Sequence, residues 1–189
     1  TVEHKMGENT CLNVVYDNRN PDDYGRLLGE FIQQGITKFM FWEAKVFSDS
    51  VVRSINASHR MIVQWAKDNN MDSVVIGEQD LMFTAPDAWD YYLKQMPKEF
   101  DIYLGCTYVP PISNNVLCGF HLYTVSKNYY DKFLSVDENK HIDTAISDMG
   151  GNFKFCYPFP CLQRPGFSAN NKAICDYNKI LEPKDIYKG

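Results

Sequence analysis

Several features are missing from the sequence, and each absence excludes a class of protein. The 6 cysteines form no Cys-x-x-Cys pair, so a zinc site of the usual spacing is not expected. Lys and Arg form no cluster, which argues against a nucleic-acid partner. No apolar run approaches the roughly 20 residues that a membrane helix needs, so no transmembrane segment is expected.

The composition is that of a globular protein, with 44% hydrophobic and 23% charged residues and a net charge of −5. A single domain is expected over 11–189, because no linker or repeat divides the chain. Residues 1–10, TVEHKMGENT, are expected to be a disordered end or a remnant of expression. They lack the apolar middle of a signal peptide, so the predicted location is cytoplasmic, with most cysteines as free thiols.

The first half of the chain alternates between strand and helix patterns. Strands are expected at 12–16, 38–42, 73–77 and 100–105, and helices at 21–34, 50–68 and 86–96. The first helix should be capped by Asn20 and stopped by Gly35. This order predicts an α/β protein whose neighbouring strands are parallel.

The second half is less regular. After a rigid Val109-Pro110-Pro111 loop, a strand is expected at 119–125. Two short helices should follow, one capped by Ser126 and ending at Leu134, the other running from about Asp143 to Gly150. The last strand is expected at 153–157, and the Pro-rich tail to 189 should be mostly irregular.

Polar side chains stand where three of the expected strands end, in Tyr16-Asp17-Asn18, Glu43-Ala44-Lys45 and Glu78-Gln79-Asp80. Parallel strands would bring these ends to one edge of the sheet, where ligands of such sheets bind. A cluster of carboxylates is costly unless a cation offsets it, and Mg²⁺ or Mn²⁺ prefers oxygen ligands. Turns with solvated acids remain the alternative.

The stretch SHRMIVQWAKDNNMDSVVIGEQDLMF resembles glycosyltransferase family 25 and its lipopolysaccharide and procollagen relatives, in which a Ser-His pair, a strand and an acidic triplet follow one another. LNVVYDNRNPDDYGRLLGEFIQQGITKFMFWEA is similar to the family's first strand, loop and helix, and FDIYLGCTY to its next strand. GFHLYTVSKNYYDKFL, HID and PFPCLQRPGFSAN resemble its later segments, in the same order over 11–171.

This resemblance implies a GT-A-like (Rossmann-like) fold, with a mostly parallel sheet flanked by helices. It also implies transfer of a hexose from a nucleotide-sugar, with a UDP-sugar as the expected donor, assisted by Mn²⁺ or Mg²⁺. The acceptor would be a hydroxyl of a glycan, a lipid-linked glycan or a protein. The chain departs from the family at Gln79, which stands where the family has an acid. An amide can still bind a hydroxyl, but it adds no charge to a metal site.

The resemblance also suggests roles for particular residues. Asp80 would hold the metal, with Glu78 as a poorer ligand, and Asp143 would be the catalytic base or else only a helix cap. The expected donor-binding residues are Gln79 at the ribose or sugar hydroxyls, Tyr16, Asp17 and Asn18 beside the base, Glu43, Ala44 and Lys45 along the ribose and phosphates, Ser58 and His59 facing the donor or bracing a loop, and Gln163, Arg164 and Ser168 in a tail that could cover it.

Three other functions are considered. A nucleotidyltransferase would need a glycine-rich phosphate loop near the first strand, and 17–23 contains no glycine. A degenerate glycosyltransferase-like protein would bind a nucleotide or glycan without turnover. An interaction domain would bind no small ligand at all.

Overall fold

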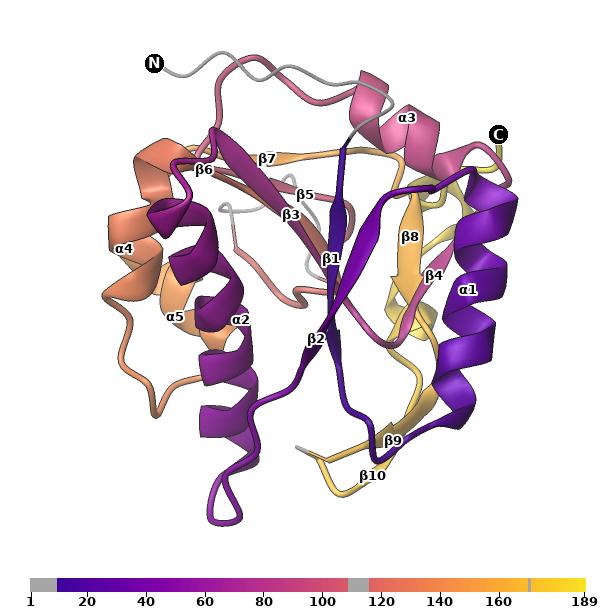
Figure 1. The fold of residues 1–189 in the computed structure, drawn as a ribbon. Helices are drawn as coiled ribbons and strands as arrows, with labels where there is room; N and C mark the ends of the chain where they lie inside the picture. The colour runs from indigo at the N-terminus through magenta and orange to yellow at the C-terminus, as the bar shows by residue number, and fades with distance from the viewer. Residues whose placement is uncertain (1–9, 109–115, 170) are drawn as a thin grey trace.

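The computed structural model describes residues 10–108, 116–169 and 171–189. A six-stranded sheet forms its centre, in the order β2-β1-β3-β6-β5-β7 (Figure 1). β2 is parallel to β1, β1 to β3 and β5 to β7, whereas β6 is antiparallel to both of its neighbours. The strands are β1 (Leu12–Tyr16), β2 (Phe39–Glu43), β3 (Ser73–Glu78), β5 (Ile102–Leu104), β6 (Leu122–Ser126) and β7 (Phe153–Phe155).

Helices cover both faces of this sheet, as expected for the fold class. Figure 1 shows α1 (Asp22–Gln34) and α3 (Ala88–Lys94) on one side, and α2 (Val51–Asp68), α4 (Tyr130–Leu134) and α5 (Ile142–Met149) on the other. Single turns of 3₁₀ helix lie at η1 (Lys127–Tyr129), η2 (Tyr177–Ile180) and η3 (Pro183–Asp185). The expected mixed α/β fold with a mostly parallel central sheet is therefore confirmed.

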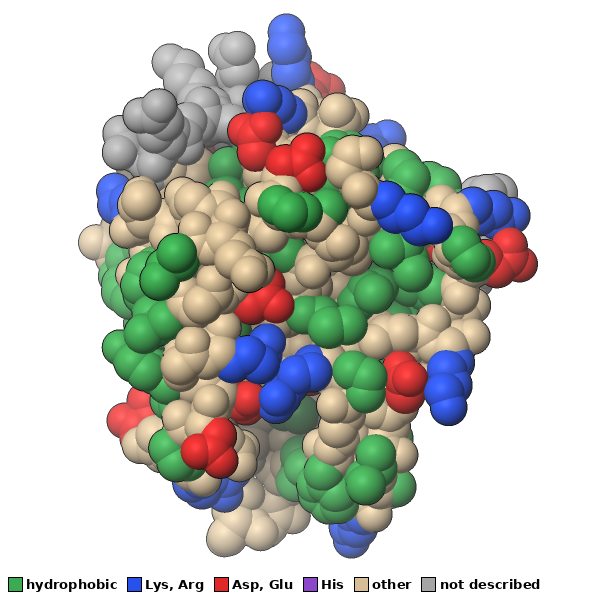
Figure 2. Space-filling model, turned by 90° about the vertical axis from the view of Figure 1, so that its right-hand side faces the viewer, with side chains coloured by type: hydrophobic (Ala, Val, Ile, Leu, Met, Phe, Trp, Pro, Cys, Tyr) green, Lys and Arg blue, Asp and Glu red, His purple; other side chains and the backbone are tan. Residues whose placement is uncertain are grey.

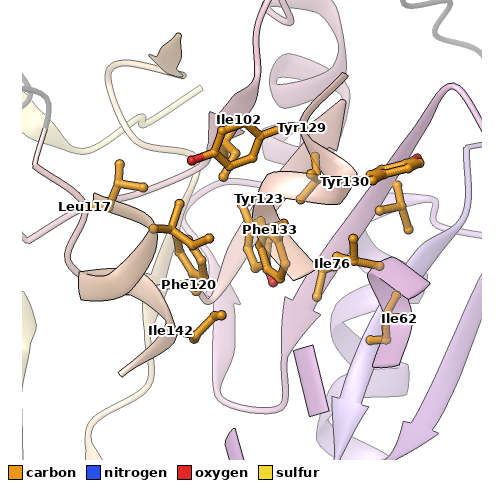
Figure 3. Packing of buried hydrophobic residues seen from close by; sticks show 14 of the residues in the cluster. Ile62, Ile76, Ile102, Leu117, Phe120, Tyr123, Tyr129, Tyr130, Phe133 and Ile142 are labelled. Atoms are coloured by element: carbon orange, nitrogen blue, oxygen red, sulfur yellow. The ribbon is translucent and has the colours of Figure 1, made fainter. Parts of the chain in front are cut away.

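Each face of the sheet carries its own hydrophobic core. Along β3, Val74 and Ile76 pack under α2, α4 and α5, while Val75 packs on the face of α1 and α3. This alternation follows from the two-residue period of a strand. In the first core the rings of Phe120, Tyr123 and Phe133 stack on one another (Figure 3).

The ends of the long helices follow from local chemistry. Gly35 closes α1 with a left-handed φ of 69°, a conformation that costs glycine little, as the sequence predicts. Ser50 caps α2 by accepting a hydrogen bond from the Arg53 N–H. The predicted cap at Asn20 is wrong, because the N-cap position is Pro21 and no side chain caps this helix.

The second half differs most from expectation. β6 is inserted between β3 and β5, so the third and fourth expected strands are not neighbours. The predicted irregular tail instead contains three short strands, β8 (Cys161–Gln163), β9 (Gly166–Ser168) and β10 (Ala173–Cys175). β8 pairs with a further strand, β4 (Leu81–Phe83), and β9 pairs with β10. Ser126 was expected to cap a helix, but its side chain makes no capping bond.

Two expectations fall outside the described residues. These are the disordered or expression-derived end, apart from Thr10, and the rigid loop at Val109-Pro110-Pro111. All six cysteines are free thiols.

Candidate functional site

The three polar strand ends lie on one edge of the sheet. In the parallel register Tyr16 is opposite Glu43, and Val15 is opposite Glu78. This edge is the lower one in Figure 1, where β1 leads into the loop before α1. The three segments that the sequence places on one edge therefore do lie together.

The loop after β1 is held by the side chain of Gln79. Oε1 of Gln79 accepts a hydrogen bond from the Asp17 N–H at 2.7 Å, and Nε2 donates to Oδ2 of Asp23 at 2.9 Å. Nε2 also lies 3.4 Å from the carbonyl oxygen of Asn20. In this structure the amide that was expected to meet ribose is engaged by the protein.

Two arginines, Arg26 and Arg164, hold the same corner. From the sequence, no site role was predicted for Arg26 or for Asp23. The guanidinium of Arg26 donates to the carbonyl oxygens of Gln79 (2.5 Å) and Leu81 (3.1 Å). Arg164 donates to Oδ1 of Asp23 at 2.6 Å. Figure 2 shows this side of the molecule, with Lys and Arg side chains adjoining Asp and Glu side chains near its centre.

Asp80 has one satisfied oxygen and one orphaned oxygen. Oδ2 accepts a hydrogen bond from Nε2 of Gln163 at 2.7 Å, but Oδ1 is buried and has no hydrogen-bond partner among the described residues. The main chain of Arg164 also donates to the Asp80 carbonyl, at 2.7 Å. Burial, and then the charge of Glu78, raise the pKa of Asp80 to about 7, against the lowering effect of the Gln163 hydrogen bond.

The pair of Glu78 and Asp80 fits a divalent cation in part. An orphaned carboxylate oxygen beside a second carboxylate is the arrangement that a bound cation would stabilise. Among the residues that the structure describes, no group of three or more His, Cys, Asp or Glu side chains is placed to hold a metal. A cation here would take two protein carboxylates and complete its shell with ligand oxygens or water.

Glu78 also contacts His59, which is buried and in turn contacts Tyr123. Nε2 of His59 lies 3.4 Å from Oε2 of Glu78, and Nδ1 of His59 lies 2.5 Å from the hydroxyl of Tyr123. Both His59 and Tyr123 are fully buried. His59 thus reaches the acid pair from α2, while Tyr123 comes from β6 and was not foreseen.

The loop after β2 is fixed by three hydrogen bonds of 2.8 Å. Nδ2 of Asn18 donates to Oε1 of Glu43 at 2.8 Å, which links the ends of β1 and β2. The N–H of Lys45 donates to Oγ of Ser58, and the N–H of Ala44 to the carbonyl of Tyr16, both at 2.8 Å. Ser58 therefore braces this loop, which is one of the two roles considered for it.

Asp143 lies at the start of α5, where Oδ2 accepts a hydrogen bond from the Gly119 N–H at 2.8 Å and Oδ1 accepts one from Thr144. The pKa of the Tyr123 hydroxyl is raised mainly by burial, and then by the charges of Glu78 and Asp143. Both carboxylates therefore lie within electrostatic range of one hydroxyl. Ser168 lies instead on the β9–β10 hairpin, where Oγ accepts from the Asn171 N–H.

Comparison with known proteins gives fold likeness only. No family model and no curated protein matches the chain. Among solved structures, a glycosyltransferase involved in glycosylation of the major capsid of PBCV-1 is 11% identical over 65% of this chain, with a TM-score of 0.45. A Drosophila β1,4-galactosyltransferase 7 in complex with manganese, UDP-Gal and xylobiose is 14% identical over 78%, with a TM-score of 0.48.

The matched region covers 61% and 64% of the lengths of these two structures. A third, A197 from STIV, is 10% identical over 78% of this chain and 81% of its own, with a TM-score of 0.45. Likeness at this level does not establish an activity. Within the described parts of the chain, no helix is both long and apolar enough to cross a membrane.

Proposed function

We propose that this protein is a glycosyltransferase that moves a sugar from a nucleotide-sugar, with UDP as the expected nucleotide, to a hydroxyl of a glycan, lipid-linked glycan or protein. The observation that carries the proposal is the Glu78–Asp80 pair at the carboxyl end of β3, with Oδ1 of Asp80 buried and without a partner among the described residues. The resemblance of the sequence segments to glycosyltransferase family 25 supports the same activity.

In this proposal Asp80 and Glu78 hold a divalent cation, which would neutralise charge on the departing diphosphate. Gln163 orients the carboxylate of Asp80 through its 2.7 Å hydrogen bond. Gln79 keeps the loop with Asp17 in place, so its contribution to donor binding is made through that loop. Tyr16, Asn18, Glu43, Ala44 and Lys45 border the donor, and Ser58 and His59 brace the strand ends.

The remaining roles concern the phosphates and the acceptor. Arg164 is 45% exposed at its side chain and has only Asp23 as an ion-pair partner in the described residues, so it can turn towards a phosphate. Asp143 is the proposed base that takes the proton from the acceptor hydroxyl. Ser168 would contact the donor only if the β9–β10 hairpin closes over it.

A second candidate is a related protein that binds the nucleotide without turnover. Its support is Gln79, whose amide is engaged by the protein and which replaces an acid of the family. Binding and turnover must therefore be measured separately.

The first experiment is thermal unfolding with a panel of nucleoside diphosphates and nucleotide-sugars, with and without Mn²⁺. A ligand at about 100 times its dissociation constant adds roughly 2.7 kcal/mol of apparent stability. We expect a Mn²⁺-dependent shift with one nucleotide, which Asp80→Ala abolishes and Asp49→Asn, at an exposed carboxylate, leaves unchanged. Hydrolysis or transfer of the matching sugar then separates an enzyme from a binder, and no shift with any ligand overturns the donor site.

A further inference from the structure

His121 stands beside the acid pair, and its ring has no hydrogen-bond partner in the part of the chain that the structure describes. It immediately precedes β6, and its carbonyl oxygen accepts a 3.0 Å hydrogen bond from the N–H of Glu78. The side chain is 1% exposed, and both Nδ1 and Nε2 are buried without a hydrogen-bond partner in the described residues. Buried polar groups in folded proteins are nearly always paired, so an imidazole with two orphaned nitrogens requires an explanation.

The polar groups of two residues beside the ring are already engaged by the protein. Tyr108 stacks on His121 with ring centroids 5.5 Å apart. Its hydroxyl accepts from the Gln163 N–H and donates to Oδ1 of Asn178. Gly119 approaches the ring closely, but its N–H donates a hydrogen bond to Oδ2 of Asp143. The described chain therefore leaves one donor and one acceptor on this imidazole unused.

The other buried histidine of the site provides a contrast. His59, also fully buried, has the Tyr123 hydroxyl at Nδ1 and Glu78 at Nε2. Within the described residues, one buried imidazole is thus paired at both nitrogens, whereas the second is unpaired at both. A ligand group is the natural partner of the second.

The chemistry of that ligand group follows from the two nitrogens of the ring. Both are buried without a partner in the described residues, and a neutral imidazole offers one N–H and one lone pair. A hydroxyl, which both donates and accepts, matches this pair.

The sheet order indicates which hydroxyl this is. In the proposed function, the base and ribose lie over the ends of β1 and β2, and the diphosphate lies at β3. β6 is the next strand, and Gly119, two residues before His121, is bonded to the proposed base Asp143. His121 therefore lies between the diphosphate position and the acceptor side, where the transferred sugar must be.

We propose that His121 is a binding residue for the transferred sugar, and that its imidazole hydrogen-bonds a sugar hydroxyl of the nucleotide-sugar. This inference rests on the proposed function. It adds a residue that determines which sugar is accepted, because a hydroxyl of the wrong configuration would leave the imidazole unpaired again.

Titration calorimetry in Mn²⁺ tests the assignment, with UDP, UDP-glucose, UDP-galactose, UDP-N-acetylglucosamine, GDP and GDP-mannose as probes. His121→Phe keeps a ring that stacks on Tyr108 but has no polar atom. We expect it to bind the nucleoside diphosphate as the unmutated protein does, and to bind the preferred nucleotide-sugar about 5- to 10-fold more weakly. His121→Gln, which restores a donor and an acceptor, should recover most of this loss.

The unliganded variants give an independent readout. Because His121→Phe removes two orphaned polar groups, its melting temperature should rise by about 2–4 °C. A fall instead would mean that the imidazole has a partner in the free protein, and would overturn the assignment.

The other outcomes separate this proposal from the proposed function. Equal binding of nucleotide-sugar by His121→Phe and by the unmutated protein, or an equal loss for diphosphate and nucleotide-sugar, overturns the role of His121 but leaves the donor site intact. Failure of the unmutated protein to bind any probe overturns both.

Discussion

The N–H of Asp17 donates a 2.7 Å hydrogen bond to the side chain of Gln79, so the residue that departs from the acidic triplet of the resembled family holds the first loop of the site. The other end of this amide donates to Asp23. Gln79 therefore has a structural reason to be an amide, because a carboxylate could accept from Asp17 but could not donate to Asp23.

Replacing Gln79 by Glu should consequently lower stability. The new carboxylate would face Oδ2 of Asp23, now 2.9 Å from the amide nitrogen, and like charges at that distance repel. We expect a loss of about 1–3 kcal/mol in the free energy of unfolding, measured with urea at pH 7.5.

Gln64→Glu is the matched control for this change. Nε2 of Gln64 also donates to an aspartate, Asp68, at 2.8 Å, but this pair is exposed to solvent. Its loss should be below about 0.5 kcal/mol. Equal losses in the two variants would mean that Gln79 is no more constrained than a surface residue.

Stability should also depend on pH through Asp80. Its pKa is raised to about 7 in the folded protein, mainly by burial, so between pH 4 and 7 the folded state holds a proton that the unfolded chain has lost. The free energy of unfolding therefore falls as pH rises through this window. Asp80→Asn removes the effect, and the variant should gain about 2–4 kcal/mol over the unmutated protein at pH 8, with little gain at pH 4.

Chemical denaturation of the unmutated protein and of Asp80→Asn from pH 4 to 8, without metal, checks this pH dependence. Asp49→Asn, at an exposed position, should show no such pH-dependent gain. A gain that is the same at pH 4 and pH 8 would mean that Asp80 does not titrate in this range. Mn²⁺ with the preferred nucleotide should stabilise the unmutated protein and not Asp80→Asn.

The parts of the fold that sequence could predict are those with a long pattern. The helix expected over 21–34, its stop at Gly35 and the strand expected over 73–77 are local properties, and all three agree with the structure. β4 and β8 have three residues each, too few for a period to be detected, and they exist because they pair with each other. The position of β6 between β3 and β5 is likewise set by pairing rather than by its own sequence.

The candidate site divides in the same way. The polar strand ends were found because parallel strands share an edge. The contact of Gln163 with Asp80 was not predicted, and it depends on the pairing of β4 with β8. Arg26 and Tyr123 were missed because their sequence positions mark them as ordinary helix and strand residues. Only the packing of α1 and β6 against β3 turns these side chains towards the acidic segment.

Tyr123→Phe should lower the stability of the protein, although the change removes only one oxygen atom. The change deletes the hydroxyl that bonds Nδ1 of the buried His59 and leaves that nitrogen without a partner. We expect a loss of about 1–3 kcal/mol in the free energy of unfolding. Tyr130→Phe also deletes a hydroxyl, which donates to the carbonyl of Met71, but this bond is only partly buried.

The loss for Tyr130→Phe should accordingly be smaller, at about 0.5–1.5 kcal/mol. A ¹⁵N spectrum of the unmutated protein adds a second check, since a hydroxyl donating to Nδ1 places the ring proton on Nε2, facing Glu78. A proton found on Nδ1 would contradict this arrangement.

Arg26→Lys should loosen the acidic segment without unfolding the protein. One guanidinium donates to two carbonyl oxygens, those of Gln79 and Leu81, and a lysine ammonium cannot reproduce this planar fork. We expect amide hydrogen exchange across 78–82 to become about 10-fold faster, since a loss of roughly 1.4 kcal/mol in local stability corresponds to that factor.

Arg19→Lys is the control, because Arg19 binds only the carboxylate of Asp17 among the described residues and is 66% exposed at its side chain. Exchange in 78–82 should not change in that variant. If Arg26→Lys left exchange there unchanged as well, the acid pair would be held by β3 and β8 alone, and Arg26 would have no part in forming the site.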